Sequence, residues 1–341
     1  MQKIRLGGTD LLIEKNGFGA LPIQRIGKEE AASLLRRAHE GGMNYFDTAR
    51  AYSDSEEKLG YAFKGMRDSL VIATKTMAKT GADMRKDLET SLRMLGTDYI
   101  DIYQFHNPPF CPRPGGADGL YDEAVKAQEE GKIRYISITN HRLAVAQEAI
   151  DSGLYATLQF PYSYLAGEPE EKLRLACEEK GMGFIAMKAL AGGLIRDGYT
   201  AAAFMETKEN VVPIWGVQHG WELEQFLDVI KNGADLTPER LATIEKDRAE
   251  LAGDFCRGCG YCMPCPVGIE INSCARMTLM LRRAPAKAWL TEHWQEEMKK
   301  IENCLQCGAC AAKCPFGLDT PRLLQDNYRD YWQILAENTG S

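Results

Sequence analysis

The chain has 341 residues, of which 45% are hydrophobic and 26% charged, and its formal net charge is −7. This composition is typical of a globular protein, and the length suits two domains better than one. The acidic balance and the absence of Lys/Arg runs argue against nucleic acid as a partner. No apolar stretch approaches the ~18 residues that a membrane-spanning helix needs, and residues 1–8 lack a signal-peptide core. We therefore expect a cytoplasmic protein.

The first 250 residues alternate between short apolar runs and longer stretches with helical spacing. Residues 1–14 favour a hairpin that turns at Gly7-Gly8. Eight strands are predicted at 17–21, 45–49, 70–76, 99–106, 133–139, 157–161, 183–188 and 211–217. Helices are predicted between and after them at 28–40, 55–65, 84–95, 119–130, 142–151, 169–180, 200–208 and 221–231.

Eight strands, each followed by a helix, predict a closed (β/α)8 barrel of the TIM type. The alternative is an open doubly wound sheet, but no GxGxxG follows the first predicted strand. A further helix is expected at 237–252, with Thr237 as N-cap and Pro238 inside it, and the chain then reaches Gly253. We place the domain border there, with the barrel at 1–252 and a second domain at 253–341.

The second domain is expected to be small, mainly helical and rich in cysteine. Helical stretches are predicted near 270–282, 286–303 and 320–337. Nine of the eleven cysteines lie between Cys256 and Cys314. Because we find no export signal, such crowding indicates metal binding rather than disulfides.

The cysteines form two blocks, each ending in Cys-Pro. The second, Cys304-x2-Cys307-x2-Cys310-x3-Cys314-Pro315, matches the bacterial ferredoxin run for [4Fe–4S] clusters. The first block, in which the last spacing is one residue shorter, consists of Cys256, Cys259, Cys262 and Cys265.

In the ferredoxin arrangement the fourth cysteine of a block ligates the other cluster. Cys256, Cys259, Cys262 and Cys314 would then hold one cluster, and Cys304, Cys307, Cys310 and Cys265 the other. Two zinc sites are the alternative. Cys274, outside both blocks, is expected to be a buried thiol.

Four polar residues occur at the ends of predicted barrel strands or just after them, where the active sites of such barrels lie. They are Asp47, Tyr52, Lys75 and His106. A nearby ammonium stabilises a phenolate and makes the phenol a better proton donor. Asp47 would keep Lys75 charged and oriented, and His106 would hold a substrate oxygen. The set suits protonation of a carbonyl oxygen while hydride reaches the carbon. Isolated structural salt bridges are the alternative.

These residues resemble the catalytic tetrad of the aldo-keto reductases. The resemblance extends from residue 1 to about 232 and includes the segments FDTA at 46–49, YSDSEEKLG at 52–60 and ALAGG at 189–193. It implies a nicotinamide cofactor, NAD(P)(H), and a small carbonyl or alcohol substrate.

The resemblance also implies residues that bind the cofactor. Asn140 and Gln159 would bind the carboxamide, Gly216 would open the phosphate loop, and Glu224 and Gln225 would lie near the adenine. Met187, next to Lys188, replaces the usual stacking aromatic residue. Trp221 stands where the family places a basic residue for the 2′-phosphate. Because Trp cannot replace an Arg–phosphate fork, a preference for NADP is doubtful.

The sequence thus predicts an oxidoreductase of the aldo-keto reductase type that also carries two clusters for electron transfer. A nicotinamide moves two electrons as hydride and a cluster moves one, so direct coupling would require a flavin or another intermediary. A ferredoxin- or flavodoxin-type carrier protein is a possible partner. The alternatives are a carbonyl reductase whose clusters are only structural, and an electron-transfer or docking protein with a non-catalytic barrel.

Overall fold

In the computed structural model, residues 3–251, 255–283 and 288–339 are described. They form two compact units. The first contains residues 1–189 and 197–244, and the second contains residues 190–196 and 245–341. The border that we expected after residue 252 falls outside the described residues.

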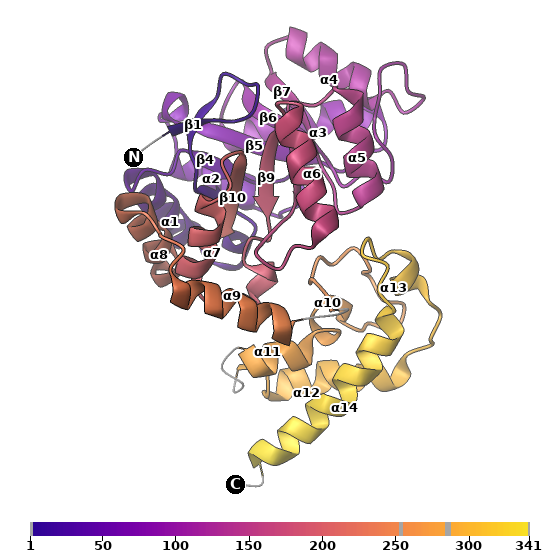
Figure 1. Ribbon diagram of the computed structural model, residues 1–341. Helices are drawn as coiled ribbons and strands as arrows, with labels where there is room; N and C mark the ends of the chain where they lie inside the picture. The colour runs from indigo at the N-terminus through magenta and orange to yellow at the C-terminus, as the bar shows by residue number, and fades with distance from the viewer. Residues whose placement is uncertain (1–2, 252–254, 284–287, 340–341) are drawn as a thin grey trace. The chain divides into compact units, whose positions relative to one another are not determined.

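A closed barrel of eight parallel strands forms the first unit, and helices enclose it (Figure 1). This confirms the predicted fold class, although several strands are shorter than expected. The strands are β3 (Gly17–Gly19), β4 (Tyr45–Asp47), β5 (Val71–Thr76), β6 (Ile100–His106), β7 (Ile133–Thr139), β8 (Thr157–Pro161), β9 (Gly183–Met187) and β10 (Val211–Gly216).

The helices of this unit follow the strands as predicted. They are α1 (Lys28–Glu40), α2 (Ser55–Ala62), α3 (Gly81–Leu95), α4 (Leu120–Glu129), α5 (Leu143–Ser152), α6 (Glu168–Glu179), α7 (Gly198–Glu206), α8 (Gly220–Asn232) and α9 (Pro238–Glu250). Helix α9 contains the division between the two units, after Ile244.

The predicted N-terminal hairpin consists of β1 (Lys3–Arg5) and β2 (Leu12–Glu14). Its side chains Leu6, Leu11 and Ile13 belong to the same buried cluster as residues from the barrel strands. Gly8 donates its backbone N–H to the carbonyl of Gly181, just before β9 begins. The hairpin therefore lies at the N-terminal end of the strands and leaves the opposite end for the polar residues.

In the described part of residues 255–339, five helices and two cysteine-rich loops make up most of the second unit. The helices are α10 (Ile271–Cys274), α11 (Met277–Arg283), α12 (Glu292–Lys299), α13 (Ala309–Ala312) and α14 (Thr320–Thr339). The helix predicted near 286–303 is shorter, because α12 begins after the N-cap Thr291 and residues 300–303 form a 3-10 turn; positions 286 and 287 lie outside the described residues.

The helical stretch that we predicted near 270–282 is divided in the structure into α10 and α11. Asn327 on α14 fills this break. Its Nδ2 donates to the carbonyl of Ala275 (3.1 Å), and its Oδ1 accepts from the N–H of Thr278 (2.8 Å). A buried side chain thus satisfies backbone groups that the helix no longer pairs.

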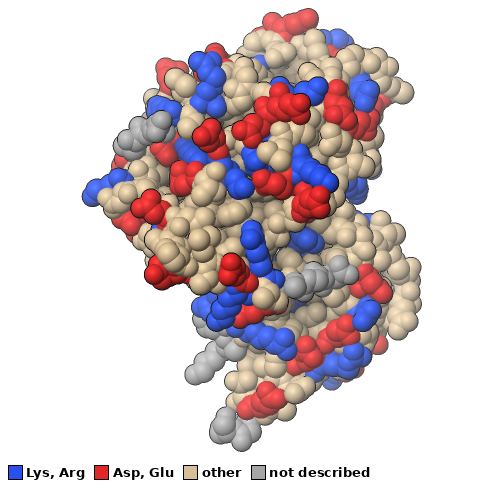
Figure 2. Space-filling model, in the orientation of Figure 1, with Lys and Arg blue, Asp and Glu red and all other residues tan. Residues whose placement is uncertain are grey.

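Lys and Arg side chains are interspersed with Asp and Glu on the face that Figure 2 shows. No helix within the described part of the chain has the length and apolarity to cross a lipid bilayer.

Candidate functional site

The predicted tetrad comes together at the C-terminal ends of β4, β5 and β6. Asp47 ends β4, Lys75 lies near the end of β5, and His106 ends β6. Lys75 Nζ donates to Asp47 Oδ1 at 2.6 Å and to the carbonyl of Thr48 at 2.6 Å. Tyr52, in the loop after β4, has its ring centroid 5.3 Å from Lys75 Nζ and 5.9 Å from that of His106. The structure therefore groups all four side chains.

Burial shifts the pKa values of Asp47, Lys75 and His106. It raises the pKa of Asp47 and lowers that of Lys75, while the attraction between the two charges opposes both shifts. Desolvation and the nearby Lys75 charge lower the pKa of His106 to about 3. His106 is therefore a neutral imidazole near pH 7, and its buried Nδ1 has no hydrogen-bond partner among the described residues.

Two glutamines donate hydrogen bonds to the carboxylate of Asp47. Gln104 Nε2 donates to Asp47 Oδ2 (3.2 Å) and to Gln159 Oε1 (2.9 Å), and Gln159 Nε2 donates to Asp47 Oδ1 (3.5 Å). We had not singled out Gln104. Its position two residues before His106 in the same strand was the available signal, since alternate residues of a strand share a face. Gln159 thus contacts the tetrad directly.

The other predicted cofactor residues at the strand ends have varied surroundings. Asn140 is fully buried and engaged locally: its Oδ1 accepts from the N–H groups of His141 (2.9 Å) and Arg142 (2.8 Å), and its Nδ2 donates to the carbonyl of Pro108 (2.8 Å). Met187 is buried at the end of β9, where its sulfur lies 3.8 Å from the hydroxyl of Thr139. Lys188 follows with a left-handed backbone, φ +57°.

Around α8 the predicted cofactor residues are more dispersed. Gly216 is exposed at the end of β10. Glu224 forms an exposed ion pair with Arg37 of α1, and Gln225 lies beside Gly198 of α7. Trp221 is 66% exposed. Within the described part of the chain, these contacts involve α1 and α7 and none of the tetrad residues.

A carboxylate occupies the N-terminus of α8, which our sequence interpretation missed. Glu222 Oε2 accepts from the backbone N–H groups of Gln218 (2.7 Å) and His219 (2.8 Å). Free N–H groups at a helix N-terminus are the usual partners of phosphate. Here the chain's own carboxylate accepts from the N-cap residue His219 and from Gln218, which precedes it.

Non-glycine residues with left-handed backbones occur at five positions within the described part of the chain. Ser53, Asn107, Lys188 and Ala191 follow the strands β4, β6 and β9, and Gln306 lies between Cys304 and Cys307. Such conformations cost of order 1–3 kcal/mol and cluster at functional sites.

In the second unit, the two cysteine blocks interleave. Cys265 of the first block lines the same cavity as Cys304, Cys307 and Cys310 of the second, with Cys262 also on its wall. Burial raises the pKa of Cys256, and the charges of Cys259 and Cys314 add to this effect. Burial raises the pKa of Cys262 to about 12, and the charges of Cys256 and Cys259 add to this effect.

The donor set fits iron–sulfur clusters. Thiolates are the ligands of [4Fe–4S] clusters, and a cubane spreads four of them around its corners instead of gathering them on one ion. Among the described residues, no three His, Cys, Asp or Glu side chains gather closely enough for a single ion. Cys274 stands apart: it is fully buried, its sulfur lies 3.8 Å from the carbonyl of Glu297, and burial raises its pKa to about 12.

Comparisons with known proteins match each unit separately. The model of the aldo/keto reductase family matches residues 13–246, and that of a 4Fe-4S dicluster domain matches residues 255–319. An uncharacterized oxidoreductase of Bacillus subtilis, YqkF, is 31% identical over 228 residues, covering 62% of this chain and 72% of that protein. The NADH-specific methylglyoxal reductase of Escherichia coli is 27% identical over 264 residues, covering 65% and 80%.

Solved structures share the barrel. The aldo-keto reductase AKR11C1 from Bacillus halodurans, in its holo form, superposes with a TM-score of 0.63 at 24% identity, over 72% of this chain and 96% of that one. An aldo-keto reductase from Klebsiella pneumoniae in complex with NADPH gives a TM-score of 0.60 at 24% identity, over 72% and 94%. At this identity the likeness shows the fold.

Proposed function

Because the chain belongs to the aldo/keto reductase family and is an oxidoreductase, we propose that its barrel interconverts a small carbonyl compound and an alcohol. Tyr52 is the proton donor, Lys75 and Asp47 set its charge environment, and His106 orients the substrate oxygen. The observation that carries this proposal is the grouping of Lys75, Tyr52 and His106, with 5.3 Å from Nζ to the phenol ring and 5.9 Å between the two rings.

The neutral state of His106 favours this assignment of roles. A neutral imidazole can donate a hydrogen bond to a carbonyl oxygen without adding a second positive charge beside Lys75. The ammonium is fixed by Asp47 and by the Thr48 carbonyl. It therefore favours the developing phenolate as the Tyr52 proton leaves.

We propose NAD(H) as the hydride carrier, with NADP(H) disfavoured. The nicotinamide cofactor supplies or accepts hydride at the substrate carbon when it is bound. Glu222 at the N-terminus of α8 would repel an added phosphate, and exposed Trp221 offers no cation for one. The E. coli relative that is NADH-specific is consistent with this choice. Neither the family models nor the relatives support the flavin that we considered.

We further propose that the second unit holds two [4Fe–4S] clusters with crossed ligands. Cys256, Cys259, Cys262 and Cys314 would bind one, and Cys304, Cys307, Cys310 and Cys265 the other. The shared cavity of Cys265 with three cysteines of the second block supports this, as does the electrostatic effect of Cys314 on Cys256.

The clusters would exchange single electrons with a carrier protein of the ferredoxin or flavodoxin type. Cys307 is exposed, and its neighbour Leu305 is 66% exposed, whereas Cys256 is buried. The cluster bound by Cys307 would then be the nearer one to a docked carrier.

Anaerobic purification followed by iron, sulfide and visible-absorption analysis tests the cluster proposal. We expect about eight irons and eight sulfides per chain. NADH and NADPH are then added separately with methylglyoxal as a probe carbonyl, and with other small aldehydes and ketones. NADH oxidation that depends on a carbonyl would support the barrel chemistry. If none of the carbonyls or the corresponding alcohols reacts with either nucleotide, the reductase proposal is wrong.

A further inference from the structure

One segment of the barrel sequence belongs to the cysteine-rich unit. The chain leaves the first unit after Ala189, contributes residues 190–196 to the second, and returns to the first at Asp197. This segment follows β9 and the left-handed Lys188, and it contains a 3-10 turn, Ala191–Gly193. Its Leu194 and Ile195 are buried. A loop that continues a strand bearing predicted cofactor residues is therefore grouped with the second unit.

Arg276 makes a direct contact with this segment. Its Nη1 donates to the carbonyl of Gly192 at 2.9 Å. A Cβ on Gly192 would lie 2.8 Å from the same nitrogen, and a Cβ on Gly258 would lie 2.7 Å from Arg276 Cζ. Both glycines have positive φ, +67° and +63°. The guanidinium thus lies between two backbone stretches that leave no room for a side chain.

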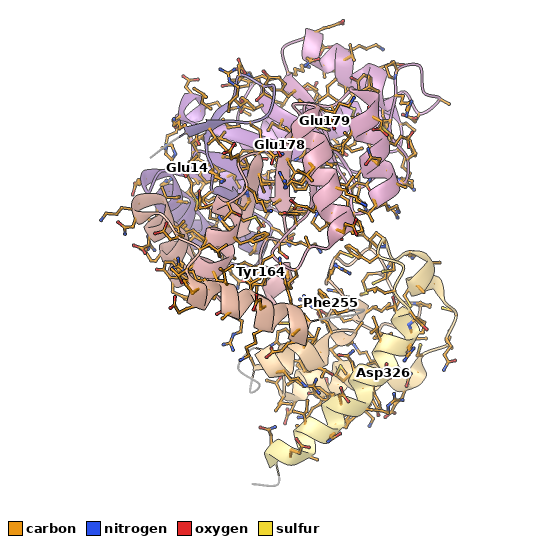
Figure 3. The ribbon with its side chains drawn as sticks, viewed as in Figure 1. Glu14, Tyr164, Glu178, Glu179, Phe255 and Asp326 are labelled. Carbon is orange, nitrogen blue, oxygen red and sulfur yellow. The ribbon has the colours of Figure 1, made fainter. Side chains whose placement is uncertain are left out.

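Gly258 belongs to the first cysteine block. Its N–H donates to the sulfur of Cys256 at 3.4 Å. The next side chain, Arg257, lies over the rings of Phe255 (4.8 Å) and Phe316 (4.5 Å); Figure 3 labels Phe255. Phe316 follows Cys314-Pro315, so these contacts join the start of one cysteine block to the end of the other. The backbone against Arg276 is therefore part of the proposed cluster site.

The break between α10 and α11 places Arg276 where it can make these contacts. Arg276 lies between the two short helices, and Asn327 holds the backbone on either side of it. In a continuous helix over 270–282, this residue would have had a regular helical position. The break between α10 and α11 therefore determines where the guanidinium of Arg276 lies.

We propose that Arg276 is a positioning residue that makes the order of segment 190–196 depend on the cluster bound through Cys256. With the cluster in place, its ligands fix the backbone at Arg257-Gly258, and the guanidinium transmits that constraint to Gly192. The positive charge also favours the reduced cluster, which carries one more negative charge than the oxidised form. The inference rests on the proposed cluster ligands.

Hydrogen exchange and redox titration of the full-length, anaerobically purified protein test this inference. The amides of Gly193 and Ile195, which both donate to the carbonyl of Leu190, report on the segment. In Arg276→Gln we expect them to exchange about tenfold faster, as fits the loss of one charged hydrogen bond. We also expect one cluster potential to become more negative at unchanged iron content.

Two further variants separate charge from contact. Arg276→Lys keeps the charge but not the planar fork, so faster exchange with a nearly unchanged potential is expected. Gly192→Ala introduces a Cβ against Nη1 and should speed exchange while iron content and potential stay unchanged. Arg282→Gln, which removes an exposed arginine of the same unit paired with Asp330 at 3.8 Å, is the control.

The outcomes distinguish this inference from the function on which it rests. If the wild-type chain binds no iron, the cluster proposal itself is wrong. If Arg276→Gln keeps its iron and segment 190–196 exchanges as slowly as in the wild type, only the role of Arg276 is overturned. If Arg276→Gln fails to fold, unchanged exchange in Gly192→Ala decides against the inference.

Discussion

Lys75 and Asp47 form an ion pair of 2.6 Å in which both side chains are almost fully buried, at 1% and 2% exposure. Removing one partner leaves the other charge without compensation. We expect Lys75→Met to destabilise the barrel by about 3–5 kcal/mol, and the double variant Asp47→Asn/Lys75→Met to cost less than the sum of the two single changes. Urea unfolding followed by circular dichroism measures this. Lys28→Met, which breaks an exposed pair with Glu57, is the control and should change the stability far less.

Tyr52→Phe should abolish most carbonyl turnover while leaving the fold intact, because it removes the proposed proton donor and keeps the ring. A decrease of about 10²–10⁴-fold in kcat is expected from the loss of a general acid. Tyr61→Phe is the matched control, since its hydroxyl donates to the carboxylate of Glu29 at the surface. Equal activity of the two variants would favour the alternative of a non-catalytic barrel.

The low pKa of His106, about 3, predicts how stability depends on pH. An unfolded histidine binds a proton below pH ~6.5, whereas the folded one stays neutral until about pH 3. His106 therefore lowers the free energy of unfolding as pH falls below 6.5. Compared with His106→Gln, the wild type should lose relative stability between pH 7 and pH 5 in urea unfolding. A constant difference between the two proteins would contradict the assigned pKa.

The crossed ligand sets predict which substitutions affect the same cluster. Cys265 and Cys304 are proposed ligands of the same cluster. Cys265→Ser and Cys304→Ser should therefore each lose that cluster and keep about four irons in the other one. Both variants should then give the same electron paramagnetic resonance spectrum. Cys314→Ser should lose the cluster of the other set, so it should show the spectrum of the cluster bound through Cys265 and Cys304. Cys274→Ser is the control and should retain all the iron. If Cys265→Ser and Cys314→Ser give the same residual spectrum, the crossing is wrong.

Glu222 predicts the choice of nucleotide. We expect NADH to bind more tightly than NADPH. Glu222→Gln removes the negative charge at the α8 N-terminus, so it should reduce the preference for NADH over NADPH. Fluorescence titrations with both nucleotides give the ratio of dissociation constants. Glu239→Gln, in the first turn of α9, tests for a general effect of lost charge. Tighter binding of NADPH than NADH by the wild type would refute the assignment.

The repeating pattern of the barrel could be predicted because each strand and helix is apolar at its own period, and the tetrad follows from where strands end. Gln104 was missed because a polar residue inside a strand does not reveal its partner, and Asp47 is distant in sequence. The helix break at Arg276 depends on Asn327, more than fifty residues later. The grouping of residues 190–196 with the second unit likewise arises from long-range contacts that local periodicity does not encode.

The discontinuous second unit also constrains how the protein is made. Residues 190–196 leave the ribosome well before Arg276, so a nascent barrel has one loop that cannot reach its final surroundings until the cysteine-rich region has been synthesised. A chain truncated after residue 244 would retain every barrel strand and still carry an unfinished loop after β9.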